Sequence, residues 1–203
     1  RPDVQGIRGL AIASVIAFHL KPEQFPAGFV GVDIFFVLSG YLMSSILGRE
    51  LAINSQVIWG FYTRRFKRIV PIYALLLLAL YFFVPLLLMK RDIAKFEHDA
   101  VWAATFTTNI HSINEKVNYF TELYDSNVLT HTWSLGVEIQ YYIIVPVIVV
   151  SQRMLKRWLG PPFLLFLISA SLMYQSFTSK NVSFNSLVSR VWQFLGGAIA
   201  HEV

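Results

Sequence analysis

The sequence predicts an all-α protein, a polytopic bundle with about six membrane-spanning helices and one re-entrant or interfacial helix. Three observations support this fold class. Hydrophobic residues make up 55% of the 203 residues and charged residues only 14%, whereas a soluble domain carries about a quarter charged residues. Mean hydropathy is +0.54. The apolar residues form separate runs that end in prolines or basic clusters, as the spans of multi-pass membrane proteins do.

Composition also excludes several classes of function. The formal net charge of +5 does not indicate nucleic-acid binding, because the basic residues gather at the ends of apolar runs, where they mark cytoplasmic loops. Cysteine is absent, which excludes disulfides, thiolate ligands and cysteine nucleophiles. No glycine-rich phosphate loop, Gly-x-Ser-x-Gly elbow or His-Glu-x-x-His motif occurs, so we expect neither a metal nor a permanently bound cofactor.

The first predicted span, residues 4–20, carries Arg8 near its start and His19 near its end. Their spacing corresponds to about three helical turns, so both side chains share one face, roughly 16 Å apart. His19 could act as an acid or base, or could donate one hydrogen bond to a neighbouring helix. Arg8 could bind an anion or carboxylate, or could extend to the cytoplasmic interface. For each of the two residues, the spacing alone leaves both alternatives open.

The second predicted span, residues 29–47, contains one ionisable residue, Asp33, at its outer start. Asp33 either lies in the first helical turn, where an anion suits the helix dipole, or faces His19 and orients its imidazole. Ser39 and the glycines of residues 31–40 would permit close helix packing in both cases.

The densest basic run precedes the third predicted span, residues 69–89, and comprises Arg64, Arg65, Lys67 and Arg68. These cations could bind phosphates, or could anchor the cytoplasmic end of the span. Between residues 90 and 131 the best apolar stretch is 100–110. This stretch is too short and too rich in Thr and Asn to cross the bilayer readily, so we expect it to form the re-entrant or interfacial helix.

Three further spans are predicted at residues 132–150, 163–177 and 187–200. Glu138 lies just inside the first of them, on one face with Ser134 and Tyr142. Its burial requires protonation or a cation such as Arg8 or Arg190, and either an internal ion pair or a substrate role fits.

The basic runs also predict the orientation. If residues 64–68 and 153–157 are cytoplasmic, so is the start of the chain, and the polar loop 178–186 lies outside. A glycosylation sequon at residues 181–183 agrees with this.

Five ordered stretches together resemble the acyltransferase 3 family of integral membrane O-acyltransferases. They are Arg8 with His19 eleven residues later, Gly-Val-Asp-Ile-Phe-Phe-Val-Leu-Ser-Gly at 31–40, Arg-Arg-Phe-Lys-Arg-Ile-Val-Pro at 64–71, Thr-Trp-Ser-Leu-Gly-Val-Glu at 132–138 with Gln140 and Tyr141, and Ser-Arg-Val-Trp-Gln-Phe-Leu-Gly-Gly-Ala at 189–198. Many bacterial members read Val-Glu-Glu-Gln-Phe-Tyr at 137–142 and Trp-Glu at 192–193. The residues present here resemble the nematode branch instead.

The resemblance implies transfer of an acyl group, often acetyl, from cytoplasmic acyl-CoA to a hydroxyl of a carbohydrate or lipid-linked acceptor at the outer or lumenal side. It implies that His19 is the catalytic base and is essential together with Arg8, and that Arg64, Arg65, Lys67 and Arg68 meet the CoA phosphates. Asp33 or Glu138 would set the state of the imidazole. Support for the substrate or the fold would come from Ser39, Trp133, Ser134 and Arg190.

Family members usually have about ten spans, so we expect the single domain of residues 1–203 to continue beyond Val203. The alternative is a transporter or lipid-handling protein, in which the intramembrane ionisable residues form a proton or substrate pathway. An inactive scaffold is a third reading.

Overall fold

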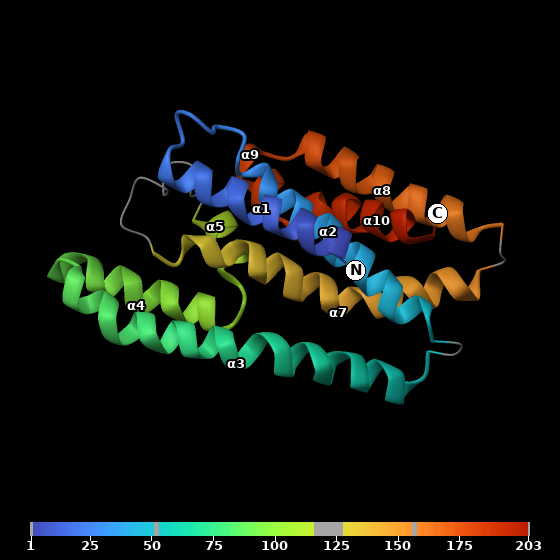
Figure 1. Ribbon diagram of the computed structural model, residues 1–203, viewed down its shortest axis with the longest axis horizontal. Coiled ribbons are helices and arrows are strands. Elements are labelled where there is room, and N and C mark those ends of the chain that lie inside the picture. The colour runs from blue at the N-terminus through green and yellow to red at the C-terminus, as the bar shows by residue number, and fades with distance from the viewer. Residues whose placement is uncertain (1, 51–52, 116–127, 156–157, 203) are drawn as a thin grey trace. The chain divides into compact units, whose positions relative to one another are not determined.

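The computed structural model describes residues 2–50, 53–115, 128–155 and 158–202 (Figure 1). Within these ranges the chain is almost entirely helical and forms no strand, which confirms the all-α prediction. The elements are α1 (Pro2–Leu20), α2 (Val30–Gly48), α3 (Ser55–Leu87), α4 (Lys90–Ala104), α5 (Thr108–Asn114), η1 (Thr130–Thr132), α7 (Trp133–Met154), α8 (Gly160–Phe177), α9 (Lys180–Asn185) and α10 (Leu187–Glu202).

Three helical stretches in the described part of the chain are long and apolar enough to cross a membrane: Val30–Gly48, Ser55–Leu87 and Thr130–Met154. They correspond to the second, third and fourth predicted spans. The other three predicted spans form α1, α8 and α10, and their crossing of the bilayer stays a prediction, as does the cytoplasmic start of the chain.

The third span is longer than its apolar run. The polar residues from Ser55 onward are helical too, because the side chain of Asn54 caps the helix by accepting a hydrogen bond from the Val57 amide. At about 1.5 Å per residue, the 33 residues of α3 extend about 50 Å, against about 30 Å of hydrocarbon. The basic run at 64–68 can therefore lie outside the apolar layer while belonging to the same helix.

The chain divides into two compact units. The first unit comprises residues 1–51, 147–173 and 190–203, and the second comprises residues 52–146 and 174–189. Helices α7, α8 and α10 each contribute residues to both units.

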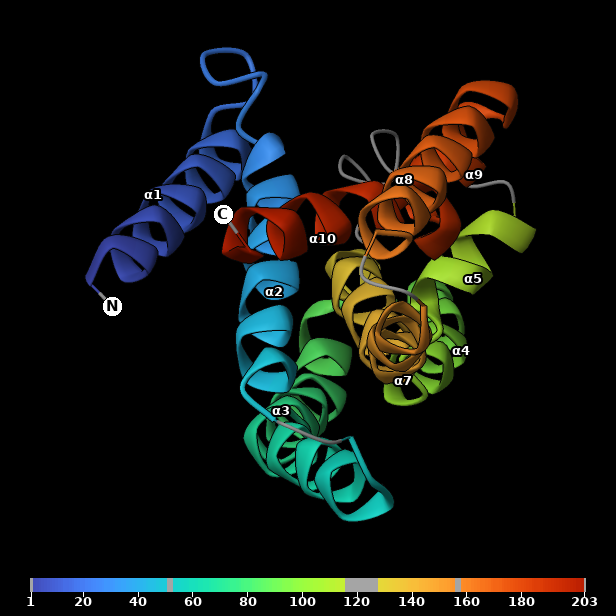
Figure 2. The same ribbon diagram turned by 90° about the vertical axis from the view of Figure 1, so that its right-hand side faces the viewer.

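Helices of the first unit approach one another through glycines. A Cβ at Gly31 of α2 would lie 2.5 Å from the Ala11 carbonyl oxygen of α1. A Cβ at Gly40 would lie 1.8 Å from the carbonyl oxygen of Phe194, where α10 crosses α2 (Figure 2). Small residues let helix backbones touch in this way, as is common in membrane bundles. The expectation of close packing around residues 31–40 is confirmed.

In the second unit, α4 runs back alongside the C-terminal half of α3 (Figure 1). Their contact buries an apolar cluster that contains Val84, Phe96, Ala103 and Leu129. The hydroxyl of Tyr73 donates to the Ala103 carbonyl at 2.9 Å.

The stretch predicted as one helix, residues 100–110, is interrupted in the structure. α4 ends at Ala104 and α5 begins at Thr108, with Phe106 at a φ of 57° between them. The threonine hydroxyls compete with helical backbone bonding here: those of Thr105 and Thr107 lie 2.6 Å apart, and Thr107 also donates to the Trp102 carbonyl at 3.3 Å. Its re-entrant or interfacial position stays a prediction.

The segment 178–186, expected as a polar loop, contains the short helix α9. The Ser179 side chain caps it by accepting from the Val182 amide. The side-chain amide of Asn181, the acceptor residue of the sequon, donates to the Ser112 carbonyl at 2.8 Å. The orientation that the sequon favours stays a prediction.

Candidate functional site

His19 lies in the last turn of α1, where its imidazole is exposed. Nδ1 is 2.7 Å from the Val15 carbonyl oxygen. A carbonyl can only accept a hydrogen bond, so the neutral ring donates from Nδ1 and carries its lone pair on Nε2. The buried Phe18 ring meets the imidazole edge-on at a centroid distance of 5.3 Å. This tautomer is the one a general base at Nε2 requires.

Arg8 is half-buried on the same continuous helix, so the predicted spacing of about three turns between Arg8 and His19 holds. A rise of roughly 16 Å separates the two side chains along the axis. They cannot act on the same atom of a substrate.

Asp33 forms an ion pair with Arg190. Arg190 Nη1 donates to Asp33 Oδ1 at 2.9 Å, and the two side chains are 8% and 28% exposed, respectively. The Gln193 side chain also donates a hydrogen bond to this carboxylate. Asp33 lies in the first turn of α2, as one of the two alternatives predicted, and the pair joins α2 to α10.

Glu138 is hydrogen-bonded to Tyr142 in the second unit, and Arg65 lies over the ring of that tyrosine. The Tyr142 hydroxyl donates to the Glu138 carboxylate, one turn away on α7. The guanidinium carbon of Arg65 lies 5.8 Å from the centroid of the Tyr142 ring, and the charge of Arg65 interacts favourably with Glu138. The expected partner was Arg8 or Arg190. In the structure Arg190 pairs with Asp33, and the cation that interacts electrostatically with Glu138 is Arg65 of α3.

The basic run divides into two groups. Arg65 is half-buried between aromatic rings, with Phe61 at 5.9 Å from its guanidinium carbon. The other cations, Arg64, Lys67 and Arg68, are exposed. Only the exposed group is open to a soluble anion. Of the second predicted run, residues 156–157 lie outside the described residues.

The other predicted supporting residues occupy the protein interior or the start of α7. Ser39 is buried in α2, and Trp133 is buried with its ring 4.5 Å from that of Phe184. Ser134 makes a long contact of 3.5 Å to the His131 carbonyl. The role of Trp133 and Ser39, in the fold or toward the substrate, stays a prediction.

Sequence reasoning missed a buried network of side-chain amides. Asn109 donates to Gln140 at 3.2 Å and to the Asn185 carbonyl at 3.1 Å, while Gln140 donates back to Asn109 Oδ1 at 2.9 Å. The network joins α5, α7 and α9. Its sequence signal is an asparagine within the apolar stretch 100–110, which gives no indication of its partners.

A cavity of about 820 Å³ lies in the first unit, between the end of α2 and the ends of neighbouring helices. Arg153 lines it and donates to the carbonyls of Leu47 and Glu50, both at 2.7 Å. The other lining residues are Ser44, Gly48, Val149, Gln152, Leu155, Gly160, Pro161 and His201. The predicted site residues are not among those that line it.

Residues 1–202 match the family model described as an acyltransferase domain, that of acyltransferase 3. An inferred O-acetyltransferase of Staphylococcus aureus strain COL is 38% identical over 152 residues, which cover 74% of this chain and 25% of that protein. The O-acetyltransferase OatA of strain NCTC 8325 is 33% identical over 149 residues, or 73% of this chain and 24% of OatA. The chain thus matches about a quarter of the length of these relatives. No solved structure gives a significant match.

Proposed function

The chain belongs to the acyltransferase 3 family, and from this we propose that it is the membrane part of an O-acyltransferase that moves an acyl group from acyl-CoA to a hydroxyl. Two relatives named as O-acetyltransferases support acetyl as the group transferred. We propose cytoplasmic acyl-CoA as the donor and a carbohydrate or lipid-linked hydroxyl at the outer or lumenal side as the acceptor. The nematode-like branch stays a prediction.

The observation that carries the proposal is the hydrogen bond from His19 Nδ1 to the Val15 carbonyl. In the proposed step, His19 Nε2 takes the proton of the acceptor hydroxyl as its oxygen attacks the thioester carbonyl. The C–O bond forms, the C–S bond breaks, and the CoA thiolate leaves and receives the proton from His19. The ring is then neutral again and ready for another turnover.

The charged residues around the basic run suit the donor. Arg64, Lys67 and Arg68 are exposed and would bind the CoA phosphates through charge-assisted hydrogen bonds. Arg65 is held by Tyr142 and Glu138, so we assign Glu138 a positioning role toward the basic run. Arg8 would bind a part of a substrate distant from the reacting carbon, since it lies roughly 16 Å from His19 along the helix.

The decisive experiment measures transfer of labelled acetyl from acetyl-CoA to a panel of glycans and lipids by the purified full-length protein. His19→Gln should lower kcat by about 10²- to 10⁴-fold and leave the KM for acetyl-CoA close to that of the wild type, because a general base acts on the chemical step. Lys21→Ala, an exposed change just beyond α1, is the matched control. Near-normal turnover by His19→Gln would refute the assignment.

A second set of variants separates donor binding from chemistry. Charge reversal at Arg64, Lys67 and Arg68 should raise the KM for acetyl-CoA with little change in kcat, since these contacts are made equally in ground and transition states. An unchanged KM would remove the donor-site assignment. Substrate flux across vesicles without consumption of acetyl-CoA would favour the transporter alternative.

A further inference from the structure

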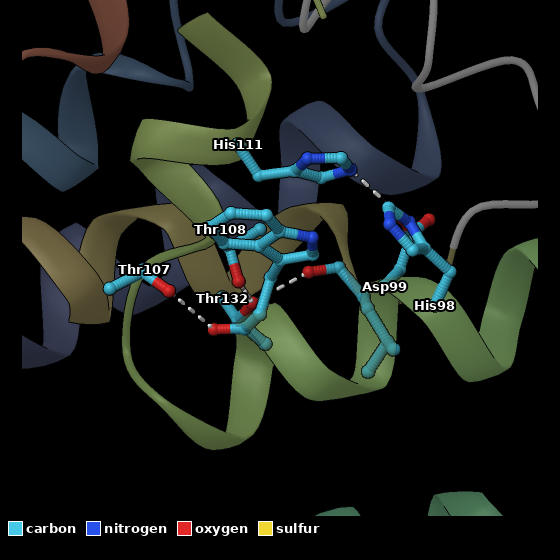
Figure 3. A network of polar contacts seen from close by, with 8 residues as sticks. His98, Asp99, Thr107, Thr108, His111 and Thr132 are labelled. Carbon is cyan, nitrogen blue, oxygen red and sulfur yellow. Dashed lines mark hydrogen bonds and ion pairs between the residues drawn. The ribbon is translucent and has the colours of Figure 1, made fainter. Parts of the chain in front are cut away.

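Three potential metal ligands gather where α4 and α5 meet: His98, Asp99 and His111 (Figure 3). One ligating atom from each lies within 4.8 Å of the others. Neither their spacing in the sequence nor any known zinc motif predicts this group. It contains none of the residues assigned to acyl transfer.

The break in the helix brings the three residues together. Because the chain turns at Phe106, α5 folds back and carries His111 to the histidine and carboxylate of α4. Threonines hold this turn: Thr105 and Thr107 bond to each other, and Thr108 lies 2.8 Å from the hydroxyl of Thr132 in η1 (Figure 3). The positions of the ligands are thus set by a hydrogen-bonded turn.

The separations of the ligating atoms fit a tetrahedral zinc ion. Asp99 Oδ1 is 3.2 Å from His111 Nε2 and 3.6 Å from His98 Nδ1. Zinc bonds to His nitrogen and carboxylate oxygen of about 2.0 to 2.1 Å place neighbouring ligands about 3.4 Å apart at a tetrahedral angle. The third separation, between the two imidazoles, requires a small rotation of a ring, which the exposed His98 side chain can make.

Burial and stacking restrain two of the three ligands. The Asp99 side chain is 6% exposed, and Trp102 stacks on the His111 ring at 4.9 Å with an interplanar angle of 8°. The His98 side chain, by contrast, is 61% exposed. An ion held here would face solvent on the His98 side, where water can occupy the fourth position, as in zinc sites with three protein ligands.

We propose that His98, Asp99 and His111 bind a divalent cation of the zinc type, which clamps α5 to α4 across the break at residues 105–107. Two imidazoles and one carboxylate are donors that Zn²⁺ accepts, whereas Ca²⁺ and Mg²⁺ prefer sets of oxygens alone. In the absence of metal, a 3.2 Å hydrogen bond joins His111 Nε2 and Asp99 Oδ1, and bonds to the ion would replace it. This inference is independent of the proposed acyl transfer.

The test uses purified full-length protein in detergent, stripped with EDTA and reloaded with zinc chloride, with bound zinc counted by mass spectrometry. The wild type should hold one zinc ion per chain. Each of the variants His98→Ala, Asp99→Asn and His111→Gln should weaken zinc binding by at least about 10- to 100-fold. That is the loss expected when even a residue that only hydrogen-bonds to a metal ligand is replaced. His131→Ala, an exposed histidine outside the group, is the matched control and should bind as the wild type does.

His98→Ala keeps the test decisive if a buried change impairs folding, because its side chain is exposed and its loss leaves no cavity. Zinc should also raise the thermal unfolding temperature of the wild type and not that of His98→Ala. Absence of zinc from the reloaded wild type, or equal zinc affinity in wild type and His98→Ala, would overturn the proposal.

Discussion

In the first unit two glycines bring crossing helices into backbone contact, whereas in the second unit a network of side-chain amides joins helices beside a single glycine contact at Gly136. Gly40 and Gly197 bring α2 and α10 into contact, with Cβ positions 1.8 and 1.9 Å from carbonyl oxygens of the opposite helix. In the second unit, Asn109 and Gln140 hydrogen-bond across α5 and α7. The crossing of α2 and α10 requires positions without a side chain, whereas the contact between α5 and α7 requires the side chains of Asn109 and Gln140.

The difference shows how each unit could hold its candidate site. Close helix packing leaves no room to rearrange, so the Asp33–Arg190 pair beside the α2–α10 crossing has a defined geometry. In the second unit, the break between α4 and α5 leaves polar groups that need hydrogen-bond partners. A network in which such groups are paired makes the surrounding backbone more rigid. The turn that brings His98, Asp99 and His111 together is held by hydrogen bonds of this type.

The largest effect is expected at the helix crossing of the first unit. Gly197→Ala would place a methyl 1.9 Å from the Val37 carbonyl oxygen, so α2 and α10 must separate, at a cost of more than about 3 kcal/mol. Gly196→Ala is the matched control: its methyl meets nothing within 4 Å, and it should stabilise α10 by about 0.5 to 1 kcal/mol. Unfolding of the full-length protein in detergent measures both. Equal unfolding temperatures for the two variants would show that the crossing is not tight.

A smaller loss is expected from the amide network of the second unit. Asn109→Ala removes three hydrogen bonds and leaves the half-buried Gln140 and the buried Asn185 carbonyl without them, so the free energy of unfolding should fall by about 2 to 3 kcal/mol. Asn114→Ala, an exposed change at the end of α5, should shift stability by less than about 0.5 kcal/mol. If Asn109→Ala and Asn114→Ala unfold alike, hydrogen bonding does not hold the second unit together.

The smallest of the three effects is expected at the ion pair. Asp33→Asn leaves the Arg190 charge without its carboxylate, at a cost of about 1 to 2 kcal/mol, below that of a fully buried pair because Asp33 is 28% exposed. The double variant Asp33→Asn, Arg190→Met should regain part of this loss, since no charge then stays buried. A double-mutant cycle on unfolding in detergent measures the coupling. Strictly additive losses would mean that the pair contributes only packing.

The elements of this protein were predictable because each depends on residues close in the sequence. Apolar runs and their basic or proline ends predicted helices at the positions of α1, α2, α8 and α10, and the spacing of Arg8 and His19 predicted a shared face. Local spacing also put Glu138 and Tyr142 on one face, where they meet. The exceptions were short-range too: threonine hydroxyls ended α4, and an asparagine cap lengthened α3.

The partners of the charged residues were decided by the tertiary structure. Asp33 and Arg190 are 157 residues apart in sequence, and Arg65 of α3 lies over the Tyr142 ring of α7, 77 positions further along the chain. His98 and Asp99 meet His111 only because the chain reverses at Phe106. Hydropathy and periodicity describe one helix at a time. Which charges meet across helices depends on where the backbones cross, and those crossings arise from glycine contacts and buried polar networks between distant segments.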